Sequence, residues 1–447
     1  MMDRTKRLTL AGRLLGLLAL AALFLIWWLR HPYGPWGRLA ALVSAALFAL
    51  LGLRFIPRWV DFWSASPLRG EPEREEPPAM GLRIFFSLWC LDLLILLAAW
   101  GLRAALGHGG SFTDTLSFWR CTDSQHYLAI ADDWYLSEGV IDRLVQLVFL
   151  PGYPVLVRLL KLLTGDSLTA GLLLSALCFA GSGVIYYRLL RLDLPHEAAL
   201  RSLVFLCLMP GSFFYAAPMS ESLFLLCSLG CVYLTRKDRW LLAGLCGAWA
   251  AFTRSLGLML AVPMIMELVA AAVHEKHVSK LISRAACILL VPLGFAAYCV
   301  INYFVAGNPW QFMIYQAQHW GQHLGLFFNT AAYQTELAIG TFTDNPHNFC
   351  GLWLPNLIYG LGALALAAAA VHDLRPSYGA WFIAYYVIAI GATWLLSAPR
   401  YLMAMPVLPM ALGRLSDKKN AKTAMLILLT LLWLLYFLVF LQRWQVW

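Results

Sequence analysis

Asp123 and His126 are the first residues of this chain whose types and spacing suit a reaction. They lie in the run RCTDSQHY (residues 120–127), directly before the apolar part of a predicted helix. A carboxylate can act as a general base on a substrate hydroxyl, and a histidine three residues later lies on the same helical face. A plain structural role is also open, because Asp or Ser favours a helix N-cap and acids stabilise its first turn.

Three further ionisable residues interrupt apolar segments. Glu221 stands in PMSES, Arg254 in FTRSL and Arg400 in SAPRY, each flanked by hydrophobic runs. Ionisable residues in such places are functional hypotheses by default. The structural alternative is an internal salt bridge, for example between Glu221 and Arg254. In the topology derived below, all three fall on the same side as Asp123, which predicts one shared outer cavity.

The segment 307–350 has no Lys or Arg and contributes Gln316 and Trp320 to the candidate pocket. Tryptophan suits a membrane interface, and its flat face also suits a sugar ring. His319 and His323 have a spacing that two metal ligands can use. Because no acidic residue or cysteine stands close by, an amphipathic interface helix is favoured and no metal site is predicted.

The elements that must position these residues are membrane helices. The 447 residues are 61% hydrophobic and 13% charged, whereas globular chains have about 45–50% and about 25%. This composition indicates an integral membrane protein and excludes a cytosolic enzyme, a secreted disulfide scaffold and a disordered chain. The net charge of +9 is attributed to membrane topology rather than to nucleic-acid binding.

Apolar runs long enough to approach a membrane span recur along the whole chain. They predict an all-α, polytopic protein with about thirteen transmembrane helices near residues 10–29, 38–56, 82–107, 168–191, 201–216, 218–235, 240–253, 257–273, 281–306, 351–371, 377–396, 400–413 and 421–441. The run 149–163 is short, contains two prolines and two basic residues, and is predicted to be a short helix at the outer interface.

The distribution of Lys and Arg orients this map. With the N-terminus in the cytoplasm, most basic residues fall in cytoplasmic segments, as the positive-inside rule requires. We therefore expect a two-helix hairpin at 1–63, a cytoplasmic Pro/Glu-rich linker at 64–81 and a main membrane domain at 82–447. The long outer loops of that domain are 108–148 and 307–350.

The ten cysteines lie mostly inside apolar runs and form no C-x-x-C pair. Buried cysteines of this kind behave as small hydrophobic residues, so neither a disulfide framework nor a zinc site is predicted. Cys121 and Cys350 fall in the two outer loops, and a bond between them is left open.

Six runs in order resemble the PIG-V-type mannosyltransferases, a family of multi-span GT-C glycosyltransferases. The runs are FWRCTDSQHYLAIADDWY, FLPGYPVLVRLL, AAPMSESLFLLCSLG, AAFTRSLGLML, GNPWQFMIYQAQHW and SAPRYLMAMP, and they extend across roughly residues 82–415. The family pattern usually has Arg-Trp-Asp before Ser-x-His. Here Cys121 and Thr122 separate Arg120 from Asp123.

The resemblance implies a GT-C-type architecture with an outer-face cavity and transfer of a sugar, mannose for this family, from a polyprenyl-phosphate donor with inversion. It implies that Asp123 is the catalytic base. His126 is expected to be an orienting or acceptor-binding group beside it. Arg254 and Arg400 are expected to hold the donor phosphate. The substrate-binding residues expected in the matching runs are Arg120, Tyr153, Glu221, Arg254, Gln316, Trp320, Arg400 and Tyr401.

The expected partners are the lipid bilayer, the lipid-linked donor and a lipid or glycan acceptor outside the cytoplasm, at a bacterial inner membrane or the endoplasmic reticulum. No cofactor, metal or nucleic acid is expected, and a small partner subunit is left open. Two other classes of function remain: a flippase or secondary transporter, which predicts internal repeats and polar residues at the bilayer midplane, and an inactive scaffold subunit.

Overall fold

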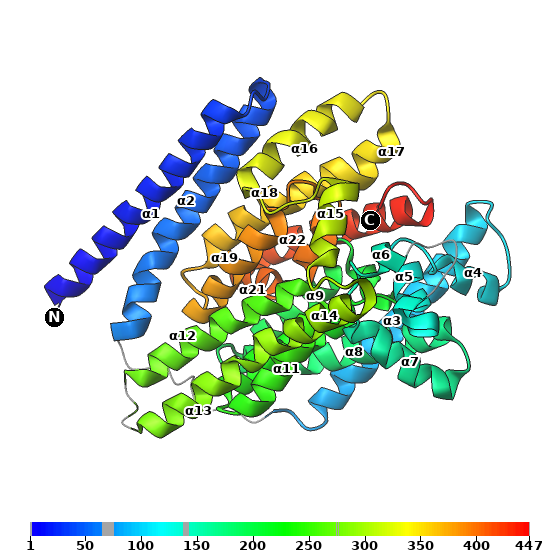
Figure 1. Ribbon diagram of the computed structural model, residues 1–447, viewed down its shortest axis with the longest axis horizontal. Helices are drawn as coiled ribbons and strands as arrows, with labels where there is room; N and C mark the ends of the chain where they lie inside the picture. The colour runs from blue at the N-terminus through cyan, green and yellow to red at the C-terminus, as the bar shows by residue number, and fades with distance from the viewer. Residues whose placement is uncertain (1, 65–75, 137–142, 274, 276, 447) are drawn as a thin grey trace.

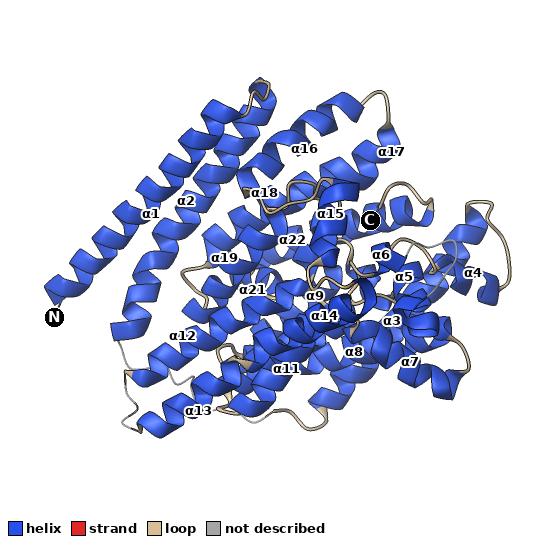
Figure 2. Ribbon diagram, in the orientation of Figure 1, coloured by secondary structure: helices blue, strands red, loops and turns tan. Residues whose placement is uncertain are grey.

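The computed structural model describes residues 2–64, 76–136, 143–273, 275 and 277–446. Helices make up this part of the chain, and it contains no strand beyond one isolated antiparallel bridge between Leu324 and Ala392 (Figures 1 and 2). Continuous apolar runs explain this, because inside a bilayer a helix satisfies every backbone hydrogen bond within its own segment. The prediction of an all-α polytopic membrane protein is confirmed.

Eight helical stretches of the described residues are long and apolar enough to cross a membrane. The helices that form them are α1 (Met2–Arg30), α2 (Pro35–Ser64), α3 (Met80–Ala105), α8 (Ser167–Arg191), η3 (Ser255–Leu260) with α12 (Ala261–Ala272), α13 (Val278–Ile288) with α14 (Leu290–Ala306), α17 (Pro346–Asn348) with η4 (Phe349–Trp353) and α18 (Leu354–Ala370), and α22 (Lys419–Leu441).

Shorter helices complete the bundle and the loops. In the bundle these are α9 (His196–Leu208), η2 (Ser212–Ala216), α10 (Glu221–Arg236), α11 (Trp240–Thr253), α19 (Pro376–Ile390), α20 (Ala398–Met403) and α21 (Val407–Leu415). In the predicted outer segments these are α4 (Phe112–Phe118), α5 (Ser124–Asp133), η1 (Trp134–Leu136), α6 (Arg143–Gln146), α7 (Gly152–Thr164), α15 (Gln311–Trp320) and α16 (Phe327–Thr341).

All thirteen apolar runs coincide with helices, but their number as membrane spans is not confirmed. The run 400–413 shows why. It divides into α20 and α21 on either side of Pro406, and seven of the nine α21 residues are buried inside the bundle. An apolar run that other helices cover and one that lipid covers look alike in sequence.

The ends of the helices gather on two opposite faces. One face carries the ion pairs Arg188–Glu76 at 3.1 Å, Arg236–Asp193 at 2.8 Å and Arg375–Glu267 at 2.6 Å, and we call it the basic face. The other face, the site face, carries the α1–α2 turn, where Glu336 of α16 accepts a hydrogen bond from the backbone of Gly34 (Figure 1). The cytoplasmic assignment of the basic face stays a prediction.

The N-terminal hairpin packs against the main body through α16 and α18, at one edge of the molecule (Figure 1). Trp27 is 2% exposed; its indole nitrogen donates to Asn329 at 2.8 Å and its ring packs against Phe328 at 5.4 Å. The predicted linker falls mostly on residues 65–75, which lie outside the described residues. Glu76, just after them, reaches Arg188 of α8.

A close crossing of α11 and α14 positions one side of the candidate site. A Cβ atom added at Gly294 of α14 would lie 1.9 Å from the carbonyl oxygen of Ala248, far inside van der Waals contact. The absent side chain therefore sets the distance between these helices. The C-terminal end of α11 leads directly into Arg254.

Candidate active site

Asp123 occupies the turn that leads into α5. The backbone of Thr122 has a φ of +50°, and the Ser124 hydroxyl donates to the carbonyl oxygens of Trp119 at 2.6 Å and Cys121 at 2.7 Å. Asp123 stands at the N-cap position, but its side chain makes no capping hydrogen bond. Its Oδ2 instead lies 2.7 Å from Nη2 of Arg400. The capping interpretation of this carboxylate is therefore wrong.

Glu221 is the first residue of α10 and is completely buried. Its Oε1 accepts hydrogen bonds from Nη1 of Arg254 at 2.7 Å and from Nε and Nη2 of Arg400 at 2.8 and 2.6 Å. The salt bridge with Arg254 that the sequence left open is present. The second oxygen, Oε2, is buried and has no hydrogen-bond partner among the described residues.

The two arginines differ in their exposure to the cavity. Arg400 has a side chain that is 2% exposed, and it bridges Glu221 and Asp123 from behind the cavity wall. Arg254 lines the cavity, with its guanidinium 5.0 Å from the centre of the Tyr401 ring. The four ionised groups carry two negative and two positive charges, so the network is neutral as a whole. We call Asp123, Glu221, Arg254 and Arg400 the ion network.

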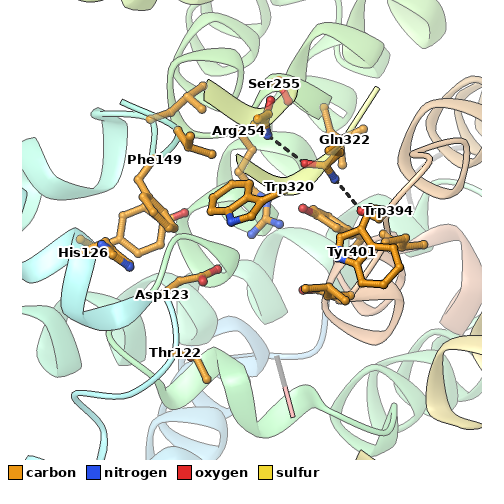
Figure 3. A pocket seen from close by; sticks show the side chains of 18 of the residues that line it. Thr122, Asp123, His126, Phe149, Arg254, Ser255, Trp320, Gln322, Trp394 and Tyr401 are labelled. Atoms are coloured by element: carbon orange, nitrogen blue, oxygen red, sulfur yellow. Dashed lines mark hydrogen bonds between the residues drawn. The ribbon is translucent and has the colours of Figure 1, made fainter. Parts of the chain in front are cut away.

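A cavity of about 330 Å³ opens beside this network on the site face, and we call it the site cavity. Its lining residues include acidic, basic, amide, hydroxyl and aromatic side chains together with aliphatic ones. They are Thr122, Asp123, Gln125, His126, Tyr127, Val148, Phe149, Leu150, Thr253, Arg254, Ser255, Leu256, Gln316, Trp320, Gln322, Trp394, Leu395, Leu396, Ser397 and Tyr401 (Figure 3).

His126 lies beside Asp123 on the wall of the site cavity (Figure 3). Its ring stacks on Phe149, with 4.4 Å between the ring centres and 12° between the planes. Burial lowers the pKa of His126 below its ordinary value, and the charge of Asp123 partly opposes this shift. The imidazole is therefore neutral at pH 7. Its Nδ1 is buried with no hydrogen-bond partner among the described residues.

Two loops meet over the other side of the cavity, residues 321–325 after α15 and 391–396 after α19. Backbone and side-chain hydrogen bonds join them: the His323 amide donates to the Thr393 hydroxyl at 2.8 Å and the Thr393 amide to the His323 carbonyl at 2.9 Å. Gln316 donates to Gln322 at 3.1 Å, and Gln322 donates to the Trp394 carbonyl at 3.0 Å (Figure 3). We call these segments the roof loops.

The structure brings together most of the residues singled out in the sequence. Asp123, His126, Arg254, Gln316, Trp320 and Tyr401 line the site cavity, and Glu221 and Arg400 belong to the ion network behind it.

Arg120 and Tyr153 are the two predicted binding residues that the structure places elsewhere. Arg120 is exposed, lies outside the cavity lining and is close enough to Asp166 to influence that carboxylate. Tyr153 is completely buried, and its hydroxyl donates to the carbonyl of Gly171 at 2.8 Å. Its ring packs behind Tyr127 at 5.6 Å, so it supports the cavity wall from inside the bundle.

Tyr127, Ser220 and Trp394 are residues of the site that the sequence reasoning did not select. The hydroxyl of Tyr127 is 2.8 Å from that of Ser220, which accepts a hydrogen bond from Arg254 at 3.2 Å. Tyr127 and Ser220 adjoin selected residues, and that adjacency was an available signal. Trp394 looked like part of a membrane span, and no sequence signal pointed to it.

The cysteines and the histidines of the outer segments can be located among the described residues. Cys121 and Cys350 are both free thiols. No group of three or more His, Cys, Asp or Glu side chains in the described ranges is arranged to hold a metal ion. His319 stacks on Tyr315, with 4.0 Å between the ring centres.

Residues 151–300 match the model of the dolichyl-phosphate-mannose-protein mannosyltransferase family. The matched segment is about a third of the chain and contains Glu221 and Arg254. No curated protein matches the sequence.

Two solved structures match part of the arrangement of this chain. ArnT from Cupriavidus metallidurans bound to undecaprenyl phosphate has 15% sequence identity and a TM-score of 0.49, and the match covers 79% of this chain and 63% of that one. The archaeal oligosaccharyltransferase AglB from Archaeoglobus fulgidus, in complex with an inhibitory peptide and a dolichol-phosphate, has 12% identity, a TM-score of 0.37 and coverage of 80% and 55%. This chain thus spans less than two-thirds of either structure.

Proposed function

We propose that this protein is a GT-C-type membrane glycosyltransferase that moves a sugar from a polyprenyl-phosphate donor to a lipid or glycan acceptor, with Asp123 as base. One observation carries the proposal. The Asp123 carboxylate lines a polar cavity with one oxygen ion-paired to Arg400, while Oδ1 has no partner among the described residues. The family match over residues 151–300 supports the same class of reaction.

The proposed transfer uses a single carboxylate. Oδ1 of Asp123 accepts the proton of the acceptor hydroxyl as that oxygen attacks the anomeric carbon of the donor. The bond between the anomeric carbon and the phosphate oxygen breaks, and its electron pair leaves with the polyprenyl phosphate, so the configuration inverts. Glu221 cannot serve as a second nucleophile, because it is buried and its Oε1 already accepts three hydrogen bonds.

Arg254 is the proposed contact for the donor phosphate. Its Nη1 makes the two hydrogen bonds of the guanidinium, to Ser220 and Glu221, which leaves Nε and Nη2 without a hydrogen-bond partner among the described residues. A guanidinium suits a phosphate because it offers several donors in a fixed plane. Arg400, which the sequence also assigned to the phosphate, is instead a positioning residue, since it is buried and bound to both carboxylates.

The remaining polar and aromatic groups of the site cavity are proposed to hold the two sugars. The neutral imidazole of His126 is placed to orient the acceptor hydroxyl beside Asp123. Trp320 and Trp394 are 39% and 38% exposed and offer flat faces to sugar rings. Mannose as the transferred sugar and PIG-V-type chemistry are proposed from the resemblance of the runs that contain these residues.

The deciding experiment measures transfer by the purified protein from defined polyprenyl-phosphate sugars, mannose first. We expect Asp123→Asn to lower the rate at least about 100-fold, the lower range of general-base contributions. Asp133→Asn is the matched control, because Asp133 is an exposed carboxylate at the other end of α5, outside the cavity lining. Turnover retained by Asp123→Asn would reject the base. Sugar movement across vesicles without a covalent product would favour a transporter.

The site face is proposed to lie outside the cytoplasm, with the N-terminus inside. This follows from the excess of basic residues in the segments that form the opposite face. To test this orientation, His323 in a roof loop and Lys419 at the start of α22 are each replaced by a single cysteine in an otherwise cysteine-free chain. A membrane-impermeant maleimide applied to intact cells should label the first and spare the second, and the reverse pattern would invert the topology.

A further inference from the structure

A second cavity, of about 380 Å³, lies on the basic face between α11 and α13. It is at the opposite end of α11 from Arg254, so it is separate from the site cavity. We call it the basic groove. Its lining residues are Asp238, Arg239, Trp240, Leu241, Leu242, Lys280, Ser283, Arg284 and Cys287.

Positive charge is in excess in the basic groove. Lys280 lies 3.5 Å from Asp238 and 3.4 Å from Glu275, and Arg284 shares the same two carboxylates at 2.5 and 3.9 Å. Arg239 is exposed, and its guanidinium has no hydrogen bond or ion pair with the described residues. Three cations thus face two carboxylates, which leaves one positive charge uncompensated.

Arg284 is the deepest of these cations. The residue is 8% exposed, its Nη2 donates to Asp238, and its guanidinium lies 5.5 Å from the centre of the Trp240 ring. Its Nε is buried and has no hydrogen-bond partner among the described residues. A buried donor without a partner is unfavourable, so an acceptor that enters the groove and bonds to it would be stabilised.

The flanks of the groove are apolar and open. On α11, Leu241 and Leu242 are 60% and 52% exposed, and on α13, Val278 and Ile282 are 67% and 64% exposed. The two helices can approach closely because Gly244 has no side chain: a Cβ atom there would lie 2.3 Å from the carbonyl oxygen of Cys287. The groove therefore has a cationic end beside the helix termini and an apolar side along them.

The start of α11 adds to the attraction for an anion. Leu241 and Leu242 belong to its first turn. Their backbone N–H groups have no partner within the helix, and the positive end of the helix dipole lies there. The cations, the buried Arg284 donor and this helix end converge on one small volume.

We propose that the basic groove binds the phosphate headgroup of an anionic membrane phospholipid, with its acyl chains along Leu241, Leu242 and Ile282. Arg239, Lys280 and Arg284 hold the phosphate. A free phosphate ion would use the same cations but would leave the exposed leucines uncovered, and this difference favours the lipid.

The test compares lipid binding to the full-length protein in detergent by native mass spectrometry, with phosphatidylglycerol and phosphatidylcholine as probes. The variant Arg239→Gln/Lys280→Gln removes two exposed cations and keeps the buried Arg284. The matched control Lys418→Gln/Lys422→Gln removes two exposed cations near the start of α22, outside the groove lining. The midpoint of thermal unfolding confirms that each variant is folded.

We expect phosphatidylglycerol to bind more tightly than phosphatidylcholine, and the groove variant to weaken phosphatidylglycerol alone by about 30-fold. The control pair should change it by less than about threefold. Equal losses in the two variants would show diffuse attraction to surface charge and overturn the proposal. So would displacement of the lipid by inorganic phosphate at the same concentration, because that would identify a free-anion site.

Discussion

Replacing Glu221 by Gln perturbs the centre of the ion network with little change of shape. Gln keeps a carbonyl oxygen in place of Oε1, so the three hydrogen bonds from Arg254 and Arg400 can persist as bonds to a neutral acceptor. The two guanidiniums stay charged but lose the opposite charge that compensates them inside the bundle. A loss of roughly 3–5 kcal/mol is therefore expected, as when a buried ion pair loses one partner.

The assay is unfolding in SDS followed by tryptophan fluorescence, in parallel with the rate of sugar transfer. Asp123→Asn should lower the free energy of unfolding by about 1 kcal/mol or less, because its side chain is 29% exposed and water can replace the carboxylate beside Arg400. It should still lower the rate of transfer at least about 100-fold. Glu221→Gln should lower both stability and transfer.

The matched control is Glu267→Gln on the basic face. Glu267 also accepts three hydrogen bonds, two from Arg375 at 2.6 and 2.7 Å and one from Ser377 at 2.6 Å. Glu267→Gln should lower the free energy of unfolding about as much as Glu221→Gln does, while the folded fraction of the protein keeps its rate of sugar transfer. The reasoning is refuted if Glu221→Gln changes the free energy of unfolding by less than about 1 kcal/mol, or if Asp123→Asn costs as much as Glu221→Gln.

Three further predictions rest on single features. Burial lowers the pKa of His126, so the unfolded chain binds a proton at this residue more readily than the folded protein as the pH falls through the ordinary histidine value. The free energy of unfolding of the wild type should therefore fall relative to that of His126→Asn between pH 7 and 5. A difference between the two proteins that stays constant with pH would contradict this. Gly294→Ala should destabilise the protein by about 1–3 kcal/mol in the SDS assay, because its methyl group would meet the backbone of Ala248; an unchanged midpoint would show that α11 and α14 separate freely. Burial raises the pKa of Cys121 to about 11, so roughly one Cys121 thiol in a thousand is ionised at pH 8. Maleimide should therefore label Cys350 far faster than Cys121. Equal labelling rates, or a disulfide between the two on a non-reducing gel, would contradict the burial of Cys121 as a free thiol.

The sequence predicted the helices well and the site in part. Apolar runs specify where helices form, because a membrane leaves few other ways to satisfy the backbone. They do not reveal whether lipid or protein covers a helix, which is why α20 and α21 were counted as a span. Arg400, inside the same run, was recognised from its charge, because a cation in an apolar segment needs a partner.

The parts of the site that escaped prediction depend on distances between loops. Trp394 and Gln322 become neighbours only because the roof loops pair across the cavity, and nothing near either residue indicates that pairing. The surroundings of Arg400 were not predicted either. Its charge suited a phosphate, but its burial between Asp123 and Glu221 could be known only from the packing of three distant segments.

The order of the four charges along the chain bears on how the protein enters the membrane during synthesis. Arg254 follows Glu221 by 33 residues, so the ribosome supplies the first partner of the buried carboxylate soon after the carboxylate itself. Arg400 follows Glu221 by 179 residues and joins a pair that is already neutral. Its charge then requires the second carboxylate, Asp123, which lies far earlier in the chain. The residue proposed as the base therefore also neutralises the last of these cations, and the cavity beside it cannot be complete before the segment that contains Trp394 and Tyr401 has been made.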